Sequence, residues 1–255
     1  MNWDIYLDHI RSDSGLVADA ARRGLEADVP CCEGWTVRHL VGHLGQVQRE
    51  KELIVRERLS APPEEITIPE ADLVDWFEEG SAMLLDALVG ADPAGPAWTW
   101  HEPDQTIGFW YRRMAQEALI HRVDAEQSFG TVSGVDEALA GDGVDELIAV
   151  MLTGLPDWAS FRATGQTVCL SVPGKSWSLE EGSFSGISPS TGNTYEDLLA
   201  FEAAAPRADI ATSISGDAAA MDLWLWGRGP IDKLTVEGDS ALADTLRQAA
   251  KEATQ

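Results

Sequence analysis

The chain has 255 residues, 44% of them hydrophobic, and ten are tryptophans. This length is near the size at which a single core stops growing, so we expect two globular domains and exclude global disorder. The formal net charge is −25, from 43 acidic and 18 basic residues. Such a charge repels a phosphate backbone and no basic cluster offsets it, so we expect no nucleic-acid partner.

The N-terminal segment, the apolar stretches and the cysteines indicate the cellular compartment. The N-terminus has no basic segment followed by an apolar run, and no stretch approaches about 18 unbroken apolar residues. We therefore expect a cytoplasmic monomer with no membrane partner. Cys31, Cys32 and Cys169 form neither an even disulfide framework nor a CxxC pair, so we expect buried thiols. Metal binding by the adjacent Cys31 and Cys32 is the weaker alternative, since vicinal side chains on an extended chain point apart.

Apolar residues at helical spacing predict four helices in the first part of the chain. They cover approximately residues 3–23, 35–56, 70–89 and 110–129. The segment between the last two is rich in Pro and Gly yet carries Trp98, Trp100 and His101, so it either lines a pocket or seals one end of the domain. Four such helices predict an antiparallel four-helix bundle over residues 1–130.

The pattern changes after the Gly130-Thr-Val-Ser-Gly134 linker. A helix is predicted at 135–152, a hairpin around Pro173-Gly174 and a strand with Ile210 and Ile214. A short helix at 221–226, a strand at 233–237 and a helix at 242–252 follow. Residues 135–255 are therefore predicted to form a smaller α+β domain, which gives the whole chain the fold class α plus α+β.

One face of the fourth predicted helix is unusual. Residues 110, 114, 117, 121 and 124 recur at spacings of three and four, which places them on one side of a helix. Trp110 and Met114 suit a buried seam, whereas Glu117, His121 and Asp124 do not. Burying a carboxylate or an imidazole costs several kcal/mol unless a partner or a metal compensates, so this face needs an explanation beyond packing.

A metal site would explain it. His43 lies on the inner face of the second predicted helix, and Glu117 and His121 stand one turn apart on the fourth. Three ligands of the His₂Glu type leave the fourth position of a tetrahedral Zn²⁺ open, as in catalytic sites.

Other assignments of these residues stay open at this point. The Glu–His spacing also suits a simple pair on a helix surface. Other candidate ligands are His39, Glu50 and Asp124. Asp124 is better placed to orient a ligand imidazole, or to pair with Arg113 or Arg122.

Several sequence blocks resemble one family. They are Gly34-Trp-Thr-Val-Arg-His-Leu-Val-Gly-His43-Leu, Trp98-Thr-Trp100, the segment from Arg113 to Glu126, Ile214-Ser-Gly-Asp217 and Leu223-Trp-Leu-Trp-Gly-Arg228. Together they resemble the mycothiol-dependent maleylpyruvate isomerase family, which belongs to the DinB-like metal-binding four-helix bundles.

The resemblance implies a set of site residues and a co-substrate. It implies a divalent metal, usually zinc, held by His43, Glu117 and His121, with the thiol of mycothiol as co-substrate. It also places Arg228 at the active site. The chain departs from the commoner family pattern at His39, where an Asp is usual.

We therefore expect a metal- and thiol-dependent enzyme. The metal lowers the pKa of a low-molecular-weight thiol, whose thiolate attacks a small electrophile, while Arg228 binds a carboxylate or a developing enolate. Isomerisation and S-transfer both fit, so the enzyme is an isomerase or a transferase. The alternatives are a metalloenzyme that uses bound water or Fe²⁺, and a non-catalytic metal-binding or sensor protein.

Overall fold

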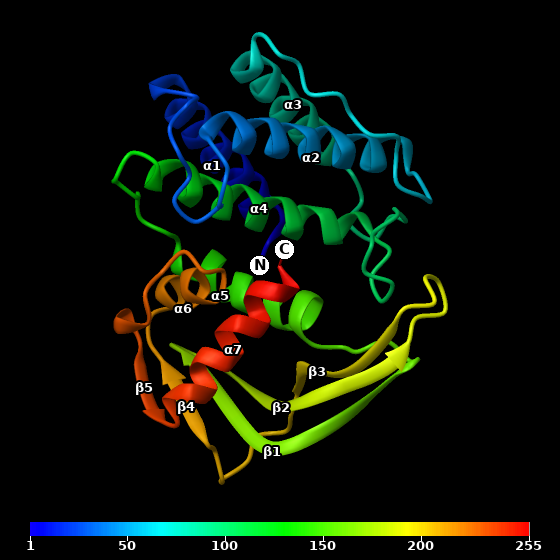
Figure 1. Ribbon diagram of the computed structural model, residues 1–255. Helices are drawn as coiled ribbons and strands as arrows, with labels where there is room; N and C mark the ends of the chain where they lie inside the picture. Colours follow the sequence, from blue (N-terminus) through cyan, green and yellow to red (C-terminus); the bar gives the residue numbers. More distant parts are fainter. Residues whose placement is uncertain (255) are drawn as a thin grey trace. The chain divides into compact units, whose positions relative to one another are not determined.

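The structure, a computed structural model, describes residues 1–254 (Figure 1). The chain divides into two compact units, Met1–Gly134 and Val135–Gln255. Among the described residues, no helix combines the length and the apolar character that crossing a membrane requires.

The first unit consists of four helices, as predicted. They are α1 (Trp3–Arg23), α2 (Val37–Glu57), α3 (Leu73–Leu88) and α4 (Ile107–Gln127). Helices α1 and α2 each pack against both α3 and α4. Thr36 and Thr106 are the N-cap residues of α2 and α4. Helix α2 starts two residues later than predicted, and α4 three residues earlier.

Helix α4 is the most buried of the four, and its polar residues have partners. The side chain of Arg122 is almost fully buried, with Nε 3.1 Å from Asp13 Oδ1 of α1 and Nη1 3.0 Å from Glu126 Oε2. Nη1 also donates to the backbone carbonyl of Ser133 at 3.0 Å. These bonds fix α4 to α1 and to the segment that follows α4.

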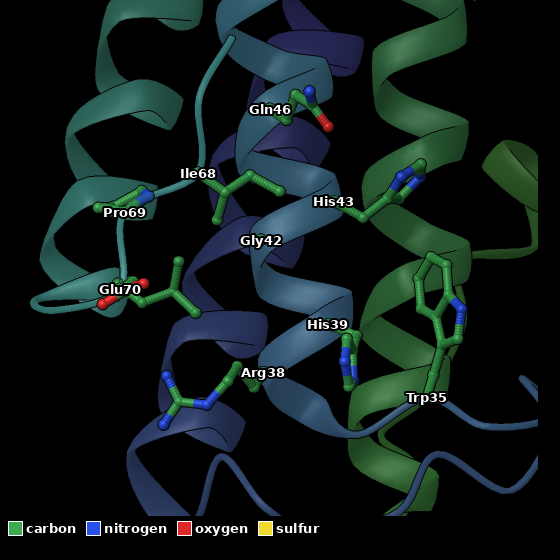
Figure 2. A pocket seen from close by; sticks show the side chains of 10 residues that line it. Trp35, Arg38, His39, Gly42, His43, Gln46, Ile68, Pro69 and Glu70 are labelled. Atoms are coloured by element: carbon green, nitrogen blue, oxygen red, sulfur yellow. The ribbon is translucent and has the colours of Figure 1, made fainter.

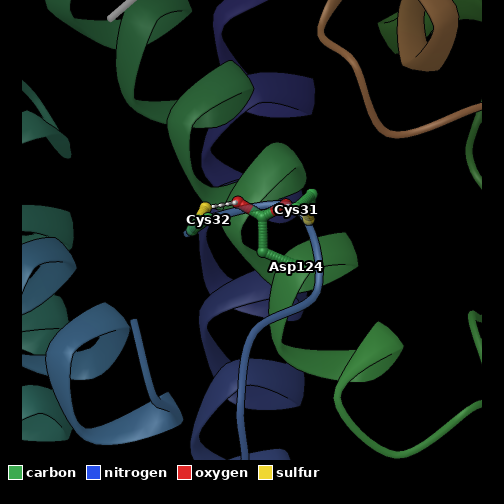
Figure 3. Close-up of side chains that lie close together, drawn as sticks. All are labelled: Cys31, Cys32 and Asp124. Atoms are coloured by element: carbon green, nitrogen blue, oxygen red, sulfur yellow. Dashed lines mark hydrogen bonds between the residues drawn. The ribbon is translucent and has the colours of Figure 1, made fainter. Parts of the chain in front are cut away.

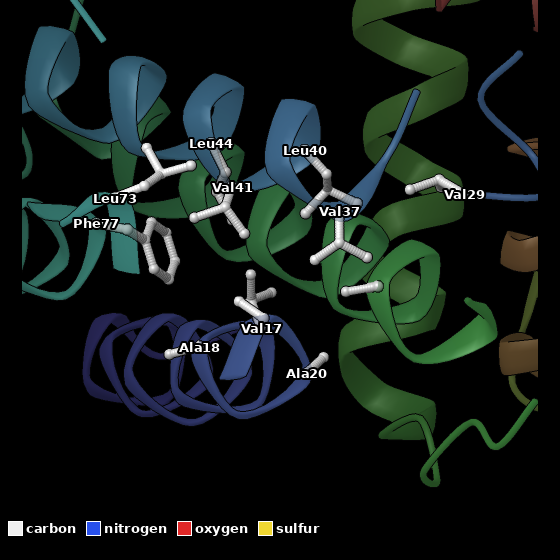
Figure 4. Packing of buried hydrophobic residues seen from close by; sticks show 12 residues of the cluster. Val17, Ala18, Ala20, Val29, Val37, Leu40, Val41, Leu44, Leu73 and Phe77 are labelled. Atoms are coloured by element: carbon white, nitrogen blue, oxygen red, sulfur yellow. The ribbon is translucent and has the colours of Figure 1, made fainter. Parts of the chain in front are cut away.

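The apolar core lies between α1, α2 and α3, with a contribution from α4 (Figure 4). Phe77 of α3 and Leu44 of α2 are fully buried in it. Helices α2 and α3 approach closely at Gly45, where an added Cβ would lie 2.5 Å from the Trp76 ring. A larger residue there would push the two helices apart.

The segment before α4 is folded tightly onto the start of that helix. The buried Thr99 hydroxyl donates to the carbonyl of His101, and the Trp98 carbonyl accepts a 2.8 Å hydrogen bond from Trp110 Nε1. Trp98 packs near the Trp110 ring, whereas Trp100 is exposed. Of the two roles predicted for this segment, these contacts favour the closing of one end of the helical unit.

The second unit contains a mixed five-stranded sheet with helices, which confirms the predicted fold class. Helix α5 (Glu137–Glu146) continues into a π-helical turn, η1 (Leu147–Leu152). The strands are β1 (Ala159–Val172), β2 (Lys175–Ile187), β3 (Thr194–Ala203), β4 (Thr212–Ser215) and β5 (Thr235–Gly238). The remaining elements are α6 (Ala218–Leu225), the 3₁₀ turn η2 (Ile231–Lys233) and α7 (Ser240–Ala253).

The sheet order is β3-β2-β1-β4-β5, with β1 antiparallel to β2 and parallel to β4. Helix α7 packs against β3, β4 and β5, and Leu170, Phe201 and Ile214 are fully buried in this unit. The sequence patterns did not predict β3, because its burial does not alternate and only Ala200 and Phe201 are buried. Ile210, predicted to lie in a strand, is exposed and precedes β4.

Replacing Phe77 by Ala tests how much the apolar core of the helical unit contributes to the stability of the protein. The substitution removes a fully buried ring and leaves a cavity, so we expect the free energy of unfolding to fall by about 3–5 kcal/mol. Urea unfolding followed by circular dichroism measures the change. Val89→Ala, at an exposed position after α3, is the control and should change stability by less than about 0.5 kcal/mol. Equal losses in the two variants would contradict this description of the core.

Candidate metal centre

The three residues predicted as metal ligands lie together. Helix α2 carries His43, and α4 carries Glu117 and His121 one turn apart. One donor atom from each of the three lies within 4.8 Å of the others. Glu117 Oε1 is 3.5 Å from His43 Nε2 and 3.2 Å from His121 Nε2. A single carboxylate oxygen therefore faces both imidazoles.

The other groups around this cluster keep its side chains in place. Glu117 Oε2 lies 3.3 Å from Arg113 Nη2, so the two oxygens of Glu117 face different partners. His121 Nδ1 lies 3.1 Å from Oδ2 of the fully buried Asp124. This contact directs Nε2 of His121 toward Glu117, which is the orientation that a metal ligand needs.

The two candidate ligands on α4, Glu117 and His121, have pKa values shifted in opposite directions. Burial alone would raise the pKa of Glu117, but hydrogen bonds from His121 and His43 and the charges of His121 and Arg113 hold it well below its ordinary value of 4.5. Burial alone would lower the pKa of His121, but hydrogen bonds to Asp124 and Glu117 and their charges raise it from 6.5 to about 9. Without a metal, His121 is thus a cation between two carboxylates.

His43 is the most accessible member of the cluster. Its side chain is 38% exposed, against 20% for Glu117 and 11% for His121. The Trp35 ring lies edge-on to His43, with centroids 5.2 Å apart, and parallel to His121 at 6.4 Å. Trp35 therefore shields the cluster on one side.

A cavity of about 460 Å³ adjoins His43 (Figure 2). Its wall combines α2 with the extended segment that precedes α3. The lining residues are Trp35, Arg38, His39, Gly42, His43, Gln46, Ile68, Pro69, Glu70 and Leu73. Of the three cluster residues, His43 is the one that lines this cavity.

The other candidate ligands have different roles. His39 Nδ1 accepts a 3.1 Å hydrogen bond from the backbone N–H of Thr36, which is the back-bond of a capping box at the start of α2. Glu50 pairs with Lys51 at 2.8 Å. Arg113 and Arg122, the predicted partners of Asp124, pair with Glu117 and with Asp13 and Glu126, respectively. His39 thus does what an acidic residue does at the third position of a helix.

A second cluster, the weaker alternative of the sequence analysis, consists of Cys31, Cys32 and Asp124 (Figure 3). Cys31 Sγ donates to Asp124 Oδ1 at 2.9 Å, and Cys32 Sγ lies 3.7 Å from Asp124 Oδ2. The expectation that the two side chains point apart is wrong, because the chain turns here and is not extended. The Cys32 N–H donates to the Val29 carbonyl and the Trp35 N–H to the Cys32 carbonyl, so this loop is tightly closed.

Arg228 belongs to the second unit. Its Nη1 donates to the carbonyl of Trp226 at 2.5 Å. Arg247 lies nearby, and burial, followed by the charge of Arg228, lowers the pKa of Arg247. Two neighbouring guanidinium groups favour an anion between them, which suits the predicted role of Arg228 toward a carboxylate.

The donor set of the first cluster fits a divalent metal. Two imidazole nitrogens and one carboxylate oxygen converge, and Asp124 holds the tautomer of one imidazole. The raised pKa of His121 means that metal binding would displace a proton from Nε2.

The pKa of His121 predicts how the stability of the metal-free protein depends on pH. A pKa raised from 6.5 to about 9 on folding contributes stability that is complete below pH 6.5 and is lost as the pH rises through 9. Glu117 contributes the opposite way, with stability present above pH 4.5 and lost as the pH falls through its lowered pKa. We expect the free energy of unfolding to fall by roughly 3 kcal/mol between pH 6.5 and 9 after chelator treatment. In the variant His121→Gln, the free energy of unfolding should change much less between pH 6.5 and 9. An equal fall in the variant and the wild type would mean that groups other than His121 cause the pH dependence.

Comparisons with known proteins were made on sequence and on structure. The model of the mycothiol maleylpyruvate isomerase N-terminal domain matches residues 11–126, and the model of the C-terminal domain of the same family matches residues 138–245. A search of curated proteins found no match.

Among solved structures, the fold is similar to the crystal structure of the mycothiol-dependent maleylpyruvate isomerase and to that of a variant of it with one histidine replaced by alanine. Each comparison has a TM-score of 0.59 and 17% identity, and covers 93% of both chains. Since the two family models together span both units, the chain belongs to the mycothiol-dependent maleylpyruvate isomerase family.

Proposed function

We propose that this protein is a metal- and mycothiol-dependent isomerase of a small unsaturated carboxylate, with maleylpyruvate as the first compound to test. The observation that carries the proposal is the convergence of His43, Glu117 and His121 within 4.8 Å, in a chain whose family is named for this reaction. The cavity beside His43 has a volume typical of small-molecule sites.

His43, Glu117 and His121 would hold the metal, and Zn²⁺ suits this donor set with one position left open. When bound, the metal would lower the pKa of the mycothiol sulfur and supply a thiolate at neutral pH. Arg113 balances part of the charge of Glu117, and Asp124 keeps Nδ1 of His121 engaged so that Nε2 is available. Trp35 limits the access of water on its side of the cluster.

The thiolate would add to one carbon of the cis double bond, and the electron pair of that bond would move to the conjugated carbonyl oxygen as an enolate. The former double bond can then rotate. The electron pair returns, the C–S bond breaks, and the trans isomer and the thiolate are released, so the thiol is regenerated. Arg228 would bind the carboxylate or the enolate oxygen, since guanidinium matches planar oxyanions. Its neighbour Arg247 supports this assignment.

S-transfer shares the first step and ends with the sulfur attached to the substrate. Proton NMR of the zinc-loaded protein with mycothiol and maleylpyruvate separates the outcomes. A trans alkene with unchanged thiol supports the isomerase, whereas a stable thioether indicates a transferase. Zinc binding without either product would indicate a binding or sensor protein, and turnover without thiol would overturn the mycothiol requirement.

Replacing His43 by Ala should remove metal and activity together. The variant loses one of three ligands, so we expect less than stoichiometric zinc after dialysis and a fall of at least about 100-fold in thiol-dependent turnover. Elemental analysis and the NMR assay measure both. His9→Gln, on α1 and outside the cluster, is the matched histidine control. Full activity of a metal-free His43→Ala protein would contradict the proposed site.

Replacing Arg228 by Ala tests the role of the second unit. Loss of a charge-assisted hydrogen bond to the substrate should lower kcat/KM by about 10- to 100-fold while zinc binding stays unchanged. Arg228→Lys keeps the charge but not the planar fork, so it should recover only part of the loss. A variant with normal kcat/KM would remove Arg228 from the mechanism.

A further inference from the structure

We infer that Cys31 and Cys32 are positioning residues of the metal centre: their thiols hold the Asp124 carboxylate in the orientation that it needs to engage His121. The inference rests on the proposed function, because it concerns the same cluster. It assigns a role to two side chains that are neither predicted ligands nor part of the proposed reaction.

The geometry links the thiols to the ligand in two steps. Cys31 Sγ donates to Asp124 Oδ1 at 2.9 Å, Cys32 Sγ lies 3.7 Å from Oδ2, and Oδ2 lies 3.1 Å from His121 Nδ1. Both oxygens of Asp124 are thus engaged by the thiol pair (Figure 3). The imidazole of His121 also engages Oδ2. Because the carboxylate is fully buried, these donors replace the water that would otherwise solvate it.

The surroundings of Cys31 suit a protonated thiol. Its sulfur faces two acceptor oxygens, Asp124 Oδ1 and Gln127 Oε1 at 3.2 Å. Reactive thiolates lie in electropositive surroundings, and a thiolate beside these oxygens would be repelled. The geometry therefore favours hydrogen-bond donation over nucleophilic catalysis.

The loop that carries the thiols also carries Trp35. Two hydrogen bonds, from the Cys32 N–H to the Val29 carbonyl and from the Trp35 N–H to the Cys32 carbonyl, fold it into consecutive turns. The Trp35 ring lies edge-on to His43 with centroids 5.2 Å apart, and near-parallel to the His121 ring at 6.4 Å. One short loop thus reaches His121 from two directions: through Asp124 at Nδ1 and through the Trp35 ring at its face.

Zinc affinity of the purified full-length protein, measured by competition with a chromogenic chelator, tests the inference. Removing a hydrogen-bond partner of a metal ligand typically weakens binding by about 10- to 100-fold. The thiols act one contact further out, through Asp124, so for the double variant Cys31→Ala/Cys32→Ala we expect the lower end of this range, about 10-fold. The Ser/Ser double variant keeps hydroxyl donors and should restore most of the affinity. Of the single variants, Cys31→Ala should have the larger effect, because its contact is the shorter one.

A second measurement separates positioning from a general loss of structure. In the zinc-bound protein, ¹⁵N NMR of the His121 ring should report the Nδ1–H tautomer in the wild type and in Ser/Ser, and a mixed or shifted signal in Ala/Ala. Cys169→Ala, in β1 of the second unit, is the matched cysteine control. It should change neither the zinc affinity nor the ¹⁵N signal of the His121 ring.

These experiments distinguish a failure of the inference about Cys31 and Cys32 from a failure of the proposed function. If the wild type binds no zinc, the proposed function fails. If the wild type binds zinc and the folded Ala/Ala variant binds it equally well with the same tautomer, the inference fails. Loss of a second equivalent of zinc in Ala/Ala would also overturn it, because the thiols would then be ligands of a site of their own.

Discussion

The contact between Glu117 Oε1 and the two imidazoles of His43 and His121 is the constraint on which the first unit depends. It joins α2 to α4 through polar atoms at a place where apolar packing would otherwise be expected. Without a cation, such a cluster needs His121 itself to be charged, and its pKa of about 9 shows that the surrounding carboxylates favour this. A divalent metal would take over the same charge balance, so the cluster is built around one positive centre in either state.

Other contacts of the first unit offset the cost of burying these groups. Arg122 pairs with Asp13 and Glu126, which ties the helix to α1 without using Glu117 or His121. Phe77, Leu44 and their neighbours form an apolar core between α1, α2 and α3. The polar face of α4 therefore lies in a unit that also has a separate apolar core. This arrangement can hold a strained or charged site without unfolding.

Much of this could be predicted from periodicity and spacing. The face formed by Trp110, Met114, Glu117, His121 and Asp124 is visible in the sequence because helical geometry is local, and His43 stands out as a histidine on an inner face. Other features depend on contacts between distant residues. Edge strand β3 has no alternating burial to reveal it, and the thiols of Cys31 and Cys32 meet Asp124 only because the loop turns at that point. The role of His39 became clear from its bond to Thr36, since the residue type alone suggested a ligand.

The division of the chain into two units has a consequence for specificity. The three candidate ligands all belong to the first unit, whereas the Arg228–Arg247 pair belongs to the second. A thiolate adds to many electron-poor double bonds, so the metal cluster alone discriminates poorly between electrophiles. Under the proposed function, the guanidinium of Arg228 would favour substrates that carry a carboxylate over analogues that lack one. Under the proposed function, substrate preference would change with the residues around Arg228 while the three candidate ligands stay the same.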